Sequence, residues 1–261
     1  MIHYAIGDVH GCYDHLARLY DTIIEHHDDR YKGEAYKIVF LGDYVDRGPS
    51  SKQVLDFLIK LDEPHHITLQ GNHEEMYLDF VQSVDENGGD EASIHAGAYW
   101  IENGGRQTLQ SYLKDDPDHS IHDDNILNPS AWFDAVSHIP RNHIRWLEDL
   151  LINKQPFHLD RGNKLLFVHA GIQMHKSFFE QSQADFLWSR DPVFLNDIEA
   201  SWGEPFVVVH GHSVSAAPMI RNRRIGVDTG ACYRGLLTSA VFENGGLIGF
   251  IHANDSSTYM R

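Results

Sequence analysis

The sequence has few cysteines, few basic residues and no long apolar run. Its 261 residues include only two cysteines, Cys12 and Cys232, which do not make a disulfide framework and suit small buried thiols. No apolar run approaches the length that crosses a membrane, and the N-terminus lacks a basic segment followed by a long apolar one. We therefore expect no membrane partner and a cytoplasmic protein.

Basic residues are outnumbered, with 21 lysines and arginines against 38 aspartates and glutamates, and the formal net charge is −17. A protein that binds a nucleic-acid duplex needs a basic surface, so this balance argues against such a partner. An anionic substrate would need a local positive site, such as bound metal ions. The hydrophobic share of 42% and the charged share of 23% are those of a globular protein, which excludes disordered and fibrous classes.

Short apolar runs rich in β-branched residues predict buried strands. They lie at residues 2–6, 36–41, 66–70, 164–169, 205–210, 224–228, 236–242 and 247–252. Two segments between the first three runs, residues 13–27 and 50–61, have the periodicity of helices. Ser50 or Ser51 is a suitable N-cap for the second of these helices. This strand–helix–strand order predicts parallel strands joined by right-handed crossovers.

The remaining chain has a different pattern. Residues from about 75 to 160 predict helices and acidic loops, which we interpret as a helical insertion over one face of a single domain, 1–261. From about residue 205, short strands and tight turns follow, as in an antiparallel sheet.

Five predicted strands end in a glycine beside Asp, Asn or His. The motifs are GDVHG (7–11), GDYVDRG (42–48), GNHE (71–74), HAG (169–171) and HGHS (210–213). Ligands in open α/β sheets bind outside the carboxyl ends of strands, and glycine lets the backbone turn sharply there. Asp, Asn and His offer oxygen and nitrogen donors that suit divalent metals. The five motifs together therefore predict a metal site.

In this order the motifs resemble those of the phosphoprotein phosphatase family of metallophosphoesterases, from residue 6 to about 242. The triplet GDxHG, GDxxDRG and GNHE is highly specific to that family. Three further segments are similar to its bacterial branch: LWSRD (187–191), GVDTGA (226–231) and NGGRQTLQSY (103–112). The resemblance implies an α/β calcineurin-like metallophosphoesterase fold, in which helices flank a central β-sandwich in four αββα layers.

The resemblance also implies two divalent metal ions and a shared water that attacks phosphorus in line. Asp43 is expected to bridge the ions. The other ligands, carried over by motif position, are Asp8 and His10 for the first ion and Asn72, His169 and His212 for the second. Mn²⁺ is the expected ion, and Fe, Zn²⁺ or Co²⁺ also suit these donors. His210 is a rival for His212, but the family pattern of Gly followed by His favours His212.

Catalytic and phosphate-binding roles follow from the same motifs. His73 resembles the general acid of the family, and Asp46 would orient it. Arg47 and Arg190 are the candidates for binding phosphate, together with Asn72.

Three other residues near these motifs receive less specific expectations. Glu74 is expected to bond nearby backbone. Asp228 is expected near the metal site, with a ligand histidine as its candidate hydrogen-bond partner, and Tyr233 is expected within reach of the pocket.

The implied function is hydrolysis of phosphomonoesters on phosphoproteins, at Ser or Thr, with Tyr as a further candidate. The alternative is symmetrical dinucleoside tetraphosphate hydrolysis, because GDVHGCYD and DTGACYRGLLT are similar to that group. That group tends to have Ala where Asp46 stands and Asp where Glu74 stands, which favours protein phosphatases. An inactive scaffold is disfavoured because every expected donor is present. A metal-dependent nuclease is disfavoured by the acidic charge and by Val214, which stands where a second histidine would follow His212.

Overall fold

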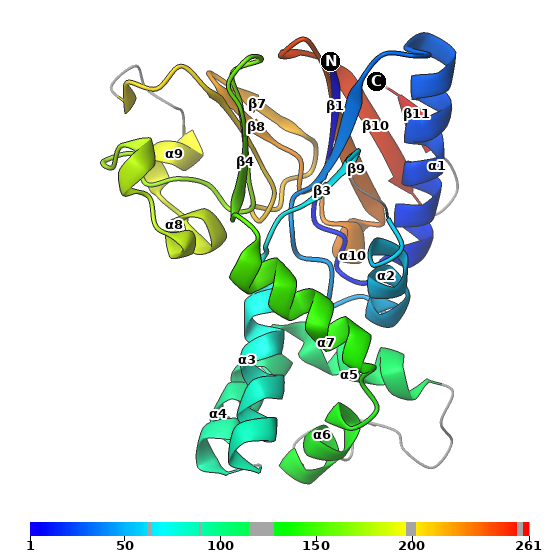
Figure 1. Ribbon diagram of the computed structural model, residues 1–261, viewed down its shortest axis with the longest axis vertical. Helices are drawn as coiled ribbons and strands as arrows, with labels where there is room; N and C mark the ends of the chain where they lie inside the picture. The colour runs from blue at the N-terminus through cyan, green and yellow to red at the C-terminus, as the bar shows by residue number, and fades with distance from the viewer. Residues whose placement is uncertain (62–63, 89, 115–127, 197–201, 255–257, 261) are drawn as a thin grey trace.

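The computed structural model describes residues 1–61, 64–88, 90–114, 128–196, 202–254 and 258–260. Within these ranges the strands form two mixed sheets that face each other, and most of the helices between residues 72 and 148 gather at one end of the sheets (Figure 1). No helix in the described part of the chain is both long and apolar enough to cross a membrane.

The first sheet has six strands in the order β11-β10-β9-β1-β2-β3. Its parallel part comprises β1 (Ile2–Ile6), β2 (Tyr36–Phe40) and β3 (His66–Thr68). Its antiparallel part comprises β9 (Leu236–Glu243), β10 (Gly246–Asn254) and β11 (Thr258–Met260). The two parts join where β9 pairs with β1, so Ile2 lies between Tyr36 of β2 and Glu243 of β9.

The second sheet has five strands in the order β4-β5-β6-β8-β7. They are β4 (Phe157–Asp160), β5 (Leu165–Val168), β6 (Val207–His210), β7 (Met219–Arg221) and β8 (Arg224–Gly226). The central strands β5, β6 and β8 are parallel, and each edge strand pairs antiparallel with its neighbour.

The alternation of side chains along the strands builds the layers. On β1, Tyr4 and Ile6 point outwards, into the apolar cluster that also contains buried residues of α1, whereas Ala5 points into a second apolar cluster, which lies between the two sheets. On β5, Phe167 joins that same inner cluster and Leu166 faces the opposite outer surface. Each sheet therefore buries both of its faces, which is why the strand runs are almost continuously apolar.

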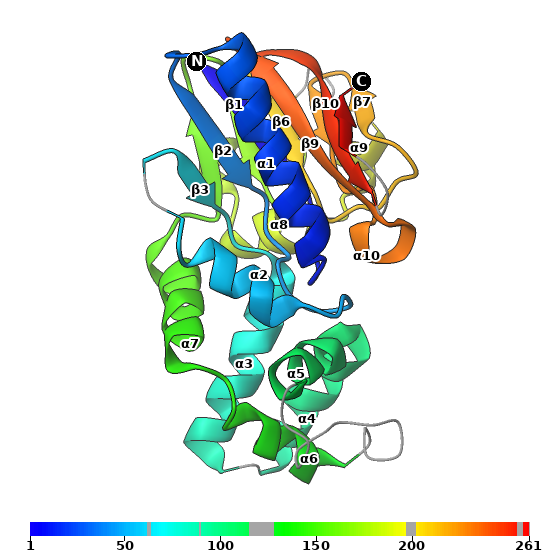
Figure 2. The ribbon, with the colours of Figure 1, turned by 90° about the vertical axis from the view of Figure 1, so that its right-hand side faces the viewer.

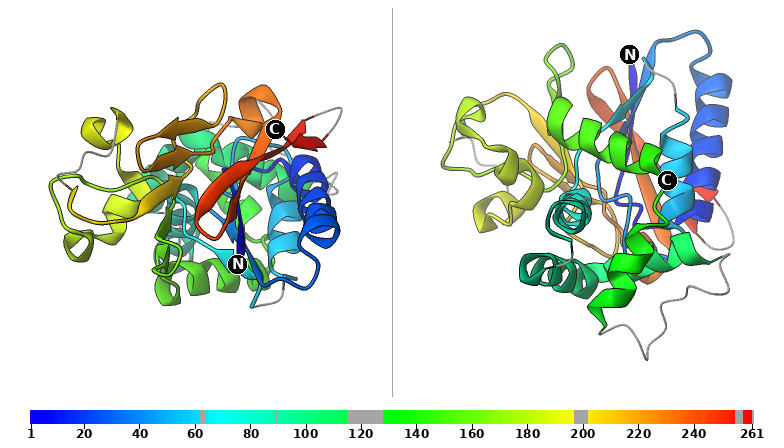
Figure 3. Two further views of the ribbon diagram at one scale, coloured as in Figure 1. Left: turned by 90° about the horizontal axis from the view of Figure 1, so that it is seen from above. Right: turned by 60° about the horizontal axis from the view of Figure 1, so that its bottom comes forward.

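Helices cover the two outer faces. The first sheet is covered by α1 (Tyr13–Arg30), with α2 (Ser51–Leu58) beside it, and the second by α8 (Gln183–Trp188) and α9 (Pro192–Asn196) (Figures 2 and 3). Ser50 occupies the N-cap position of α2, but its side chain makes no capping hydrogen bond. The four αββα layers implied by the resemblance are confirmed.

A group of helices lies beyond the ends of the sheets, below them in Figures 1 and 2. It comprises α3 (Asn72–Asn87), α4 (Glu91–Trp100), α5 (Arg106–Leu113), α6 (Pro129–Val136) and α7 (Arg141–Glu148). A segment kinked at Gly104, where φ is 110°, joins α4 to α5 (Ile101–Gly105), and a π-helical turn (Asp149–Asn153) follows α7. We call these elements, residues 72–153, the helical region. The division of the chain into one domain with an insertion stays a prediction.

All eight predicted strands are present, with ends shifted by up to two residues. Two expectations are wrong. Strand β4 lies at the end of the segment 75–160 that was expected to be helical. The chain from about residue 205 does not form one antiparallel sheet, because β6 pairs only with parallel neighbours and β9 and β10 belong to the other sheet. A short helix, α10 (Ala231–Arg234), also interrupts this part.

Candidate active site

The five motifs meet at the carboxyl ends of five strands. Asp8 and His10 follow β1, Asp43 follows β2, Asn72 begins α3 after β3, and the last two donors follow β5 and β6. All six predicted metal ligands are buried: Asp8, His10, Asp43, Asn72, His169 and His212.

Three of the residues that carry these donors have a left-handed backbone conformation. The φ angle is 43° at His10, 52° at Asp43 and 60° at His212, values that non-glycine residues seldom adopt. The surrounding structure stabilises them. The Asp43 carbonyl accepts from the backbone N–H of His10 at 2.9 Å, and the Glu74 carboxylate accepts from the N–H of Asp43 at 2.9 Å and of Tyr44 at 2.7 Å. The expectation that Glu74 bonds nearby backbone is confirmed.

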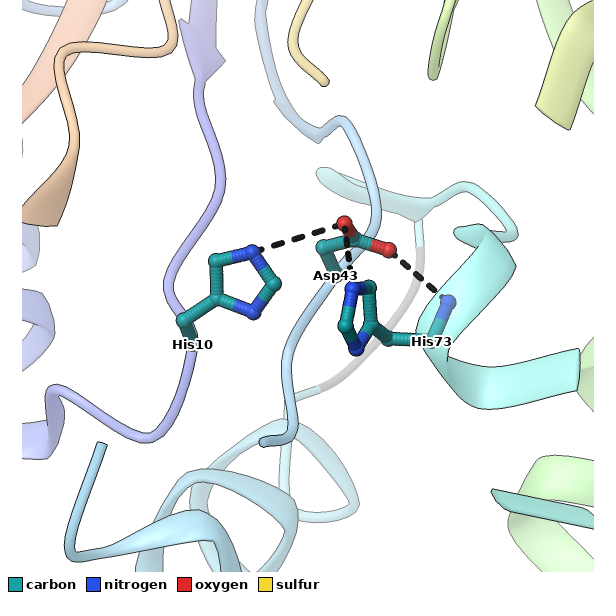
Figure 4. Close-up of side chains that lie close together, drawn as sticks. All are labelled: His10, Asp43 and His73. Atoms are coloured by element: carbon teal, nitrogen blue, oxygen red, sulfur yellow. Dashed lines mark hydrogen bonds and ion pairs between the residues drawn. The ribbon is translucent and has the colours of Figure 1, made fainter. Parts of the chain in front are cut away.

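One cluster of donor atoms contains His10, Asp43 and His73, whose ligand atoms lie within 4.8 Å of one another (Figure 4). Oδ2 of Asp43 lies 3.5 Å from Nε2 of His10 and 3.9 Å from Nε2 of His73. The backbone N–H of His73 donates to the other Asp43 oxygen at 3.0 Å.

A second cluster contains Asp43, His169 and His212, again within 4.8 Å. Nε2 of His169 lies 3.3 Å from Oδ1 of Asp43, 3.2 Å from Nδ1 of His212 and 2.9 Å from Oδ1 of Asn72. Asp43 therefore belongs to both clusters, with one carboxylate oxygen turned towards each.

The hydrogen bonds of the histidines fit metal binding. Nδ1 of His10 donates to the Val45 carbonyl and Nδ1 of His169 to the Leu41 carbonyl, each at 2.9 Å. In the neutral imidazole that assignment leaves a lone pair on each Nε2, facing the Asp43 carboxylate and able to take up a proton or a metal ion. Lone pairs gathered in this way repel unless a positive charge lies among them, so the donor set suits divalent cations.

The pKa shifts show the same preference for positive charge. Although burial opposes it, His169, His73 and His10 hold the pKa of Asp43 well below its usual range. Burial lowers the pKa of His169, but Asp43 outweighs it and raises the pKa to about 9. Burial lowers the pKa of His10 to about 3 and that of His212 to about 2, so both remain neutral donors.

Asp8 belongs to neither of these two clusters but adjoins the second one. Both of its carboxylate oxygens accept from the backbone N–H of His212, at 3.1 and 2.9 Å. Burial, and then the neighbouring Asp228 carboxylate, raise its pKa well above the usual range. Its role as a ligand of the first ion stays a prediction.

His73 forms a buried pair with Asp46. Its Nδ1 donates to Oδ2 of Asp46 at 2.7 Å, and the Asp46 side chain is fully buried. Although burial opposes it, Asp43 and Asp46 raise the pKa of His73. The indole N–H of Trp100 and the hydroxyl of Thr108 also donate to Asp46, at 2.9 and 2.7 Å. The sequence analysis assigned no role to Trp100 or Thr108. Thr108 lies in the NGGRQTLQSY segment, whose similarity to the bacterial branch was the one signal that pointed to it.

The two arginines line one cavity of about 400 Å³. Arg47 donates to Nε2 of His10 at 2.5 Å and lies over the ring of Tyr233, 5.7 Å from its centroid. Arg190 is exposed. The residues that line this catalytic cavity are Asp43, Arg47, Asn72, His73, Asn103, Trp188, Arg190, His212, Val214 and Tyr233.

His210 and Asp228 bond elsewhere. Nδ1 of His210 donates to the Gly211 carbonyl at 2.8 Å, and its Nε2 accepts from Nε of Arg224 at 2.9 Å. His210 thus neighbours the site with both nitrogens engaged. Asp228 accepts from the backbone N–H of Gly230 at 3.0 Å, and no hydrogen bond to a ligand histidine is described for it.

Two proteins of similar sequence are named bis(5'-nucleosyl)-tetraphosphatases. The asymmetrical bis(5'-nucleosyl)-tetraphosphatase PrpE of Anoxybacillus flavithermus is 26% identical over 259 residues, which cover 92% of this chain and 89% of that protein. The symmetrical bis(5'-nucleosyl)-tetraphosphatase of Legionella pneumophila is 48% identical over 71 residues, 27% of this chain and 23% of that protein.

Two solved structures share the fold. One, crystallised as a candidate diadenosine tetraphosphatase, aligns with a TM-score of 0.60 at 19% identity, over 98% of this chain and 95% of its own. The other, the cold-active protein-tyrosine phosphatase of Shewanella sp., aligns with a TM-score of 0.52 at 18% identity, over 99% and 80%. The family model for calcineurin-like phosphoesterases matches residues 4–234, and the chain belongs to that family.

Proposed function

We propose that this phosphoesterase is a dinuclear metal-dependent phosphomonoesterase that acts on phosphoproteins. The observation that supports it best is the buried pair of His73 and Asp46, which lies beside the shared donor Asp43. A seryl or threonyl alkoxide is a poor leaving group and must be protonated as it departs, so its hydrolysis needs a positioned acid.

Asp43 would hold both ions, Mn²⁺ being the expected one. His10 and Asp8 would complete the first site and Asn72, His169 and His212 the second. Bound divalent ions would supply electrostatic stabilisation of the phosphoryl group and a water of lowered pKa.

His73 is suited to deliver a proton. Because its Nδ1 donates to Asp46, the proton that can be transferred is on Nε2, which lies 3.9 Å from Oδ2 of Asp43. His73 is among the residues that line the catalytic cavity. Asp46 stabilises the charged imidazolium of His73 before the proton is transferred. Trp100 and Thr108 donate hydrogen bonds to the Asp46 carboxylate and keep it in position.

Arg47 and Arg190 would bind the phosphoryl oxygens. They are the two cations among the described residues that line the catalytic cavity, in a chain whose net charge is −17. A guanidinium presents paired donors to two oxygens of a phosphoryl group. The two arginines therefore draw an anionic substrate into an otherwise acidic protein.

A second candidate is hydrolysis of dinucleoside tetraphosphates, the activity in the names of the relatives that align over about nine-tenths of the chain. The departing group is then a nucleotide phosphate, which leaves as an anion with less need of an acid.

Substrate ranking tests the choice. Mn²⁺-reconstituted protein is assayed with phosphoserine, phosphothreonine and phosphotyrosine peptides and with diadenosine tetraphosphate. We expect the highest kcat/KM on a phosphopeptide. A higher kcat/KM on diadenosine tetraphosphate would overturn the proposal in favour of the second candidate.

A further inference from the structure

A second cavity, of about 270 Å³, adjoins the catalytic cavity and shares Trp188 with it. We call it the side pocket. Its lining residues are Glu75, Met76 and Asp79 of α3, Ala96 and Tyr99 of α4, and Trp188 at the end of α8. None of them belongs to the donor clusters, so the catalytic chemistry leaves this pocket unexplained.

Trp188 forms the wall between the two cavities. Its indole N–H donates to Oε2 of Glu75 at 2.6 Å, which fixes the ring. Two residues later, Arg190 lines the catalytic cavity. A group bound in the side pocket would thus lie next to the catalytic cavity, in contact with the indole ring that the two cavities share.

The side pocket is acidic on one side. Glu75 and Asp79 are four residues apart on α3, where two like charges on one helix face destabilise each other. Glu75 has its bond to Trp188, whereas Asp79 makes no hydrogen bond or ion pair within the described part of the chain. A cation between the two carboxylates would relieve this repulsion.

The other side of the pocket is aromatic and apolar. Tyr99 is 50% exposed, so one face of its ring is open to a ligand, and Trp188 offers a second ring. Lysine and arginine combine an apolar stem with a charged end, and their charge is attracted to aromatic faces. Met76 and Ala96 would pack on such a stem.

We propose that the side pocket binds a lysine or arginine side chain that lies close in sequence to the phosphorylated residue of the substrate. The inference rests on the proposed function and names its substrate class, a basic phosphoprotein segment. A nucleobase could also stack on the rings, but it would bring a polyphosphate chain towards two carboxylates. Charge complementarity therefore favours the basic side chain.

The test is a series of phosphoserine peptides in which one lysine moves through three positions on each side of the phosphoserine. A matched series has norleucine in place of lysine, which keeps the stem and removes the charge. We expect one lysine position to raise kcat/KM about two- to fivefold over norleucine, mainly through KM. We expect Asp79→Asn and Tyr99→Ala each to reduce this ratio.

Asp85→Asn is the matched control. Asp85 is exposed on the same helix but lines a different cavity, with Arg141 and Arg145. Asp85→Asn therefore changes the net charge as much as Asp79→Asn does, without changing the side pocket. We expect it to keep the lysine preference. No lysine preference in the unmodified protein, or an equal loss in Asp79→Asn and Asp85→Asn, would overturn the inference while leaving phosphopeptide hydrolysis intact.

Failure of the proposed function has a different signature. The protein would then hydrolyse diadenosine tetraphosphate and none of the phosphopeptides. If Tyr99→Ala also raised KM for diadenosine tetraphosphate, the pocket would hold a nucleobase, and the inference would be wrong as well.

Discussion

The strand-end loops and the helical region contribute to the site in different ways. The loops after β1, β2, β5 and β6 carry metal-type donors and are held together by hydrogen bonds between loops, and three of these donors, His10, Asp43 and His212, have a left-handed backbone. Apart from α3, whose first residues are the predicted metal ligand Asn72 and the proposed general acid His73, the helical region contributes single side chains. Among these are Trp100 and Thr108, which bond Asp46.

This difference follows from what each part must do. Donors for a pair of ions must converge within a few ångströms, and only the rigid ends of neighbouring strands bring distant segments so close. Residues that hold an acid in place need only reach it with one polar atom, which a helix laid over the loops can provide. The first task leaves dense motifs in a sequence, whereas the second leaves isolated residues.

The largest effect is expected from Asp43, the donor common to both clusters. Asp43→Asn removes the charge that both clusters share, so we expect Mn²⁺ binding to weaken at both sites and turnover to fall below detection. The measurements are Mn²⁺ bound per chain after dialysis and kcat/KM on a phosphoserine peptide. Activity retained together with full metal content would remove Asp43 from the bridging position.

The next largest effect is expected from His73. His73→Asn removes the proton donor, and we expect kcat on a phosphoserine peptide to fall by about 10²–10⁴-fold, the usual range for a lost acid–base group. The loss should be smaller on p-nitrophenyl phosphate, whose leaving group departs without a proton. Equal losses on both substrates would contradict the acid role, because a merely structural defect does not depend on the leaving group.

A smaller effect of the same kind is expected from the helical region. Thr108→Val keeps the shape of the side chain but removes the hydrogen bond that its hydroxyl donates to the Asp46 carboxylate. The Asp46 backbone N–H, which also donates to the Thr108 hydroxyl, keeps the Ser51 hydroxyl as a second acceptor. One hydrogen bond contributes about 0.5–1.5 kcal/mol, so we expect an about two- to tenfold loss on the phosphoserine peptide and less on p-nitrophenyl phosphate. Thr108 would then be a positioning residue that acts through Asp46 and His73.

Ser111→Ala is the control for Thr108→Val. Ser111 is also buried in α5, and its hydroxyl donates to the Thr108 carbonyl without reaching Asp46. We expect it to leave the ratio between the two substrates unchanged. If Thr108→Val also left this ratio unchanged, the helical region would support the fold alone.

Much of the fold and of the site could be predicted because strand runs and motifs are local. Each of the eight apolar runs contains a strand. An apolar run does not reveal whether its strand pairs parallel or antiparallel with a neighbour, so the parallel pairing of β6 was missed. Strand β7 (Met219–Arg221) was missed because it lies in no apolar run, and two of its three residues are exposed. Trp100 could not be singled out, since a buried tryptophan on a helix has the pattern of an ordinary core residue until its indole N–H is seen to reach Asp46.

The smallest expected effect concerns the junction between the helical region and α2. His143 of α7 is buried, and its nitrogens contact the Tyr112 hydroxyl at 2.8 Å and Oδ1 of Asp56 in α2 at 3.1 Å. Burial lowers the pKa of His143, and Asp56 only partly opposes this. The unfolded chain therefore binds a proton at His143 more readily than the folded one, so this contribution to stability is present at neutral pH and falls as the pH drops below about 6.5.

His143→Gln tests this junction, because glutamine keeps polar contacts but does not titrate. Urea unfolding at pH 8 should show the unmodified protein more stable by about 1 kcal/mol, the net contribution of a typical hydrogen bond. At pH 5.5 the difference should shrink, since only the unmodified protein has to keep an imidazole neutral on folding. A difference that grew at pH 5.5 would mean that His143 is charged and paired with Asp56. The helical region would then be joined to the strand-bearing part by an ion pair rather than by a neutral hydrogen bond.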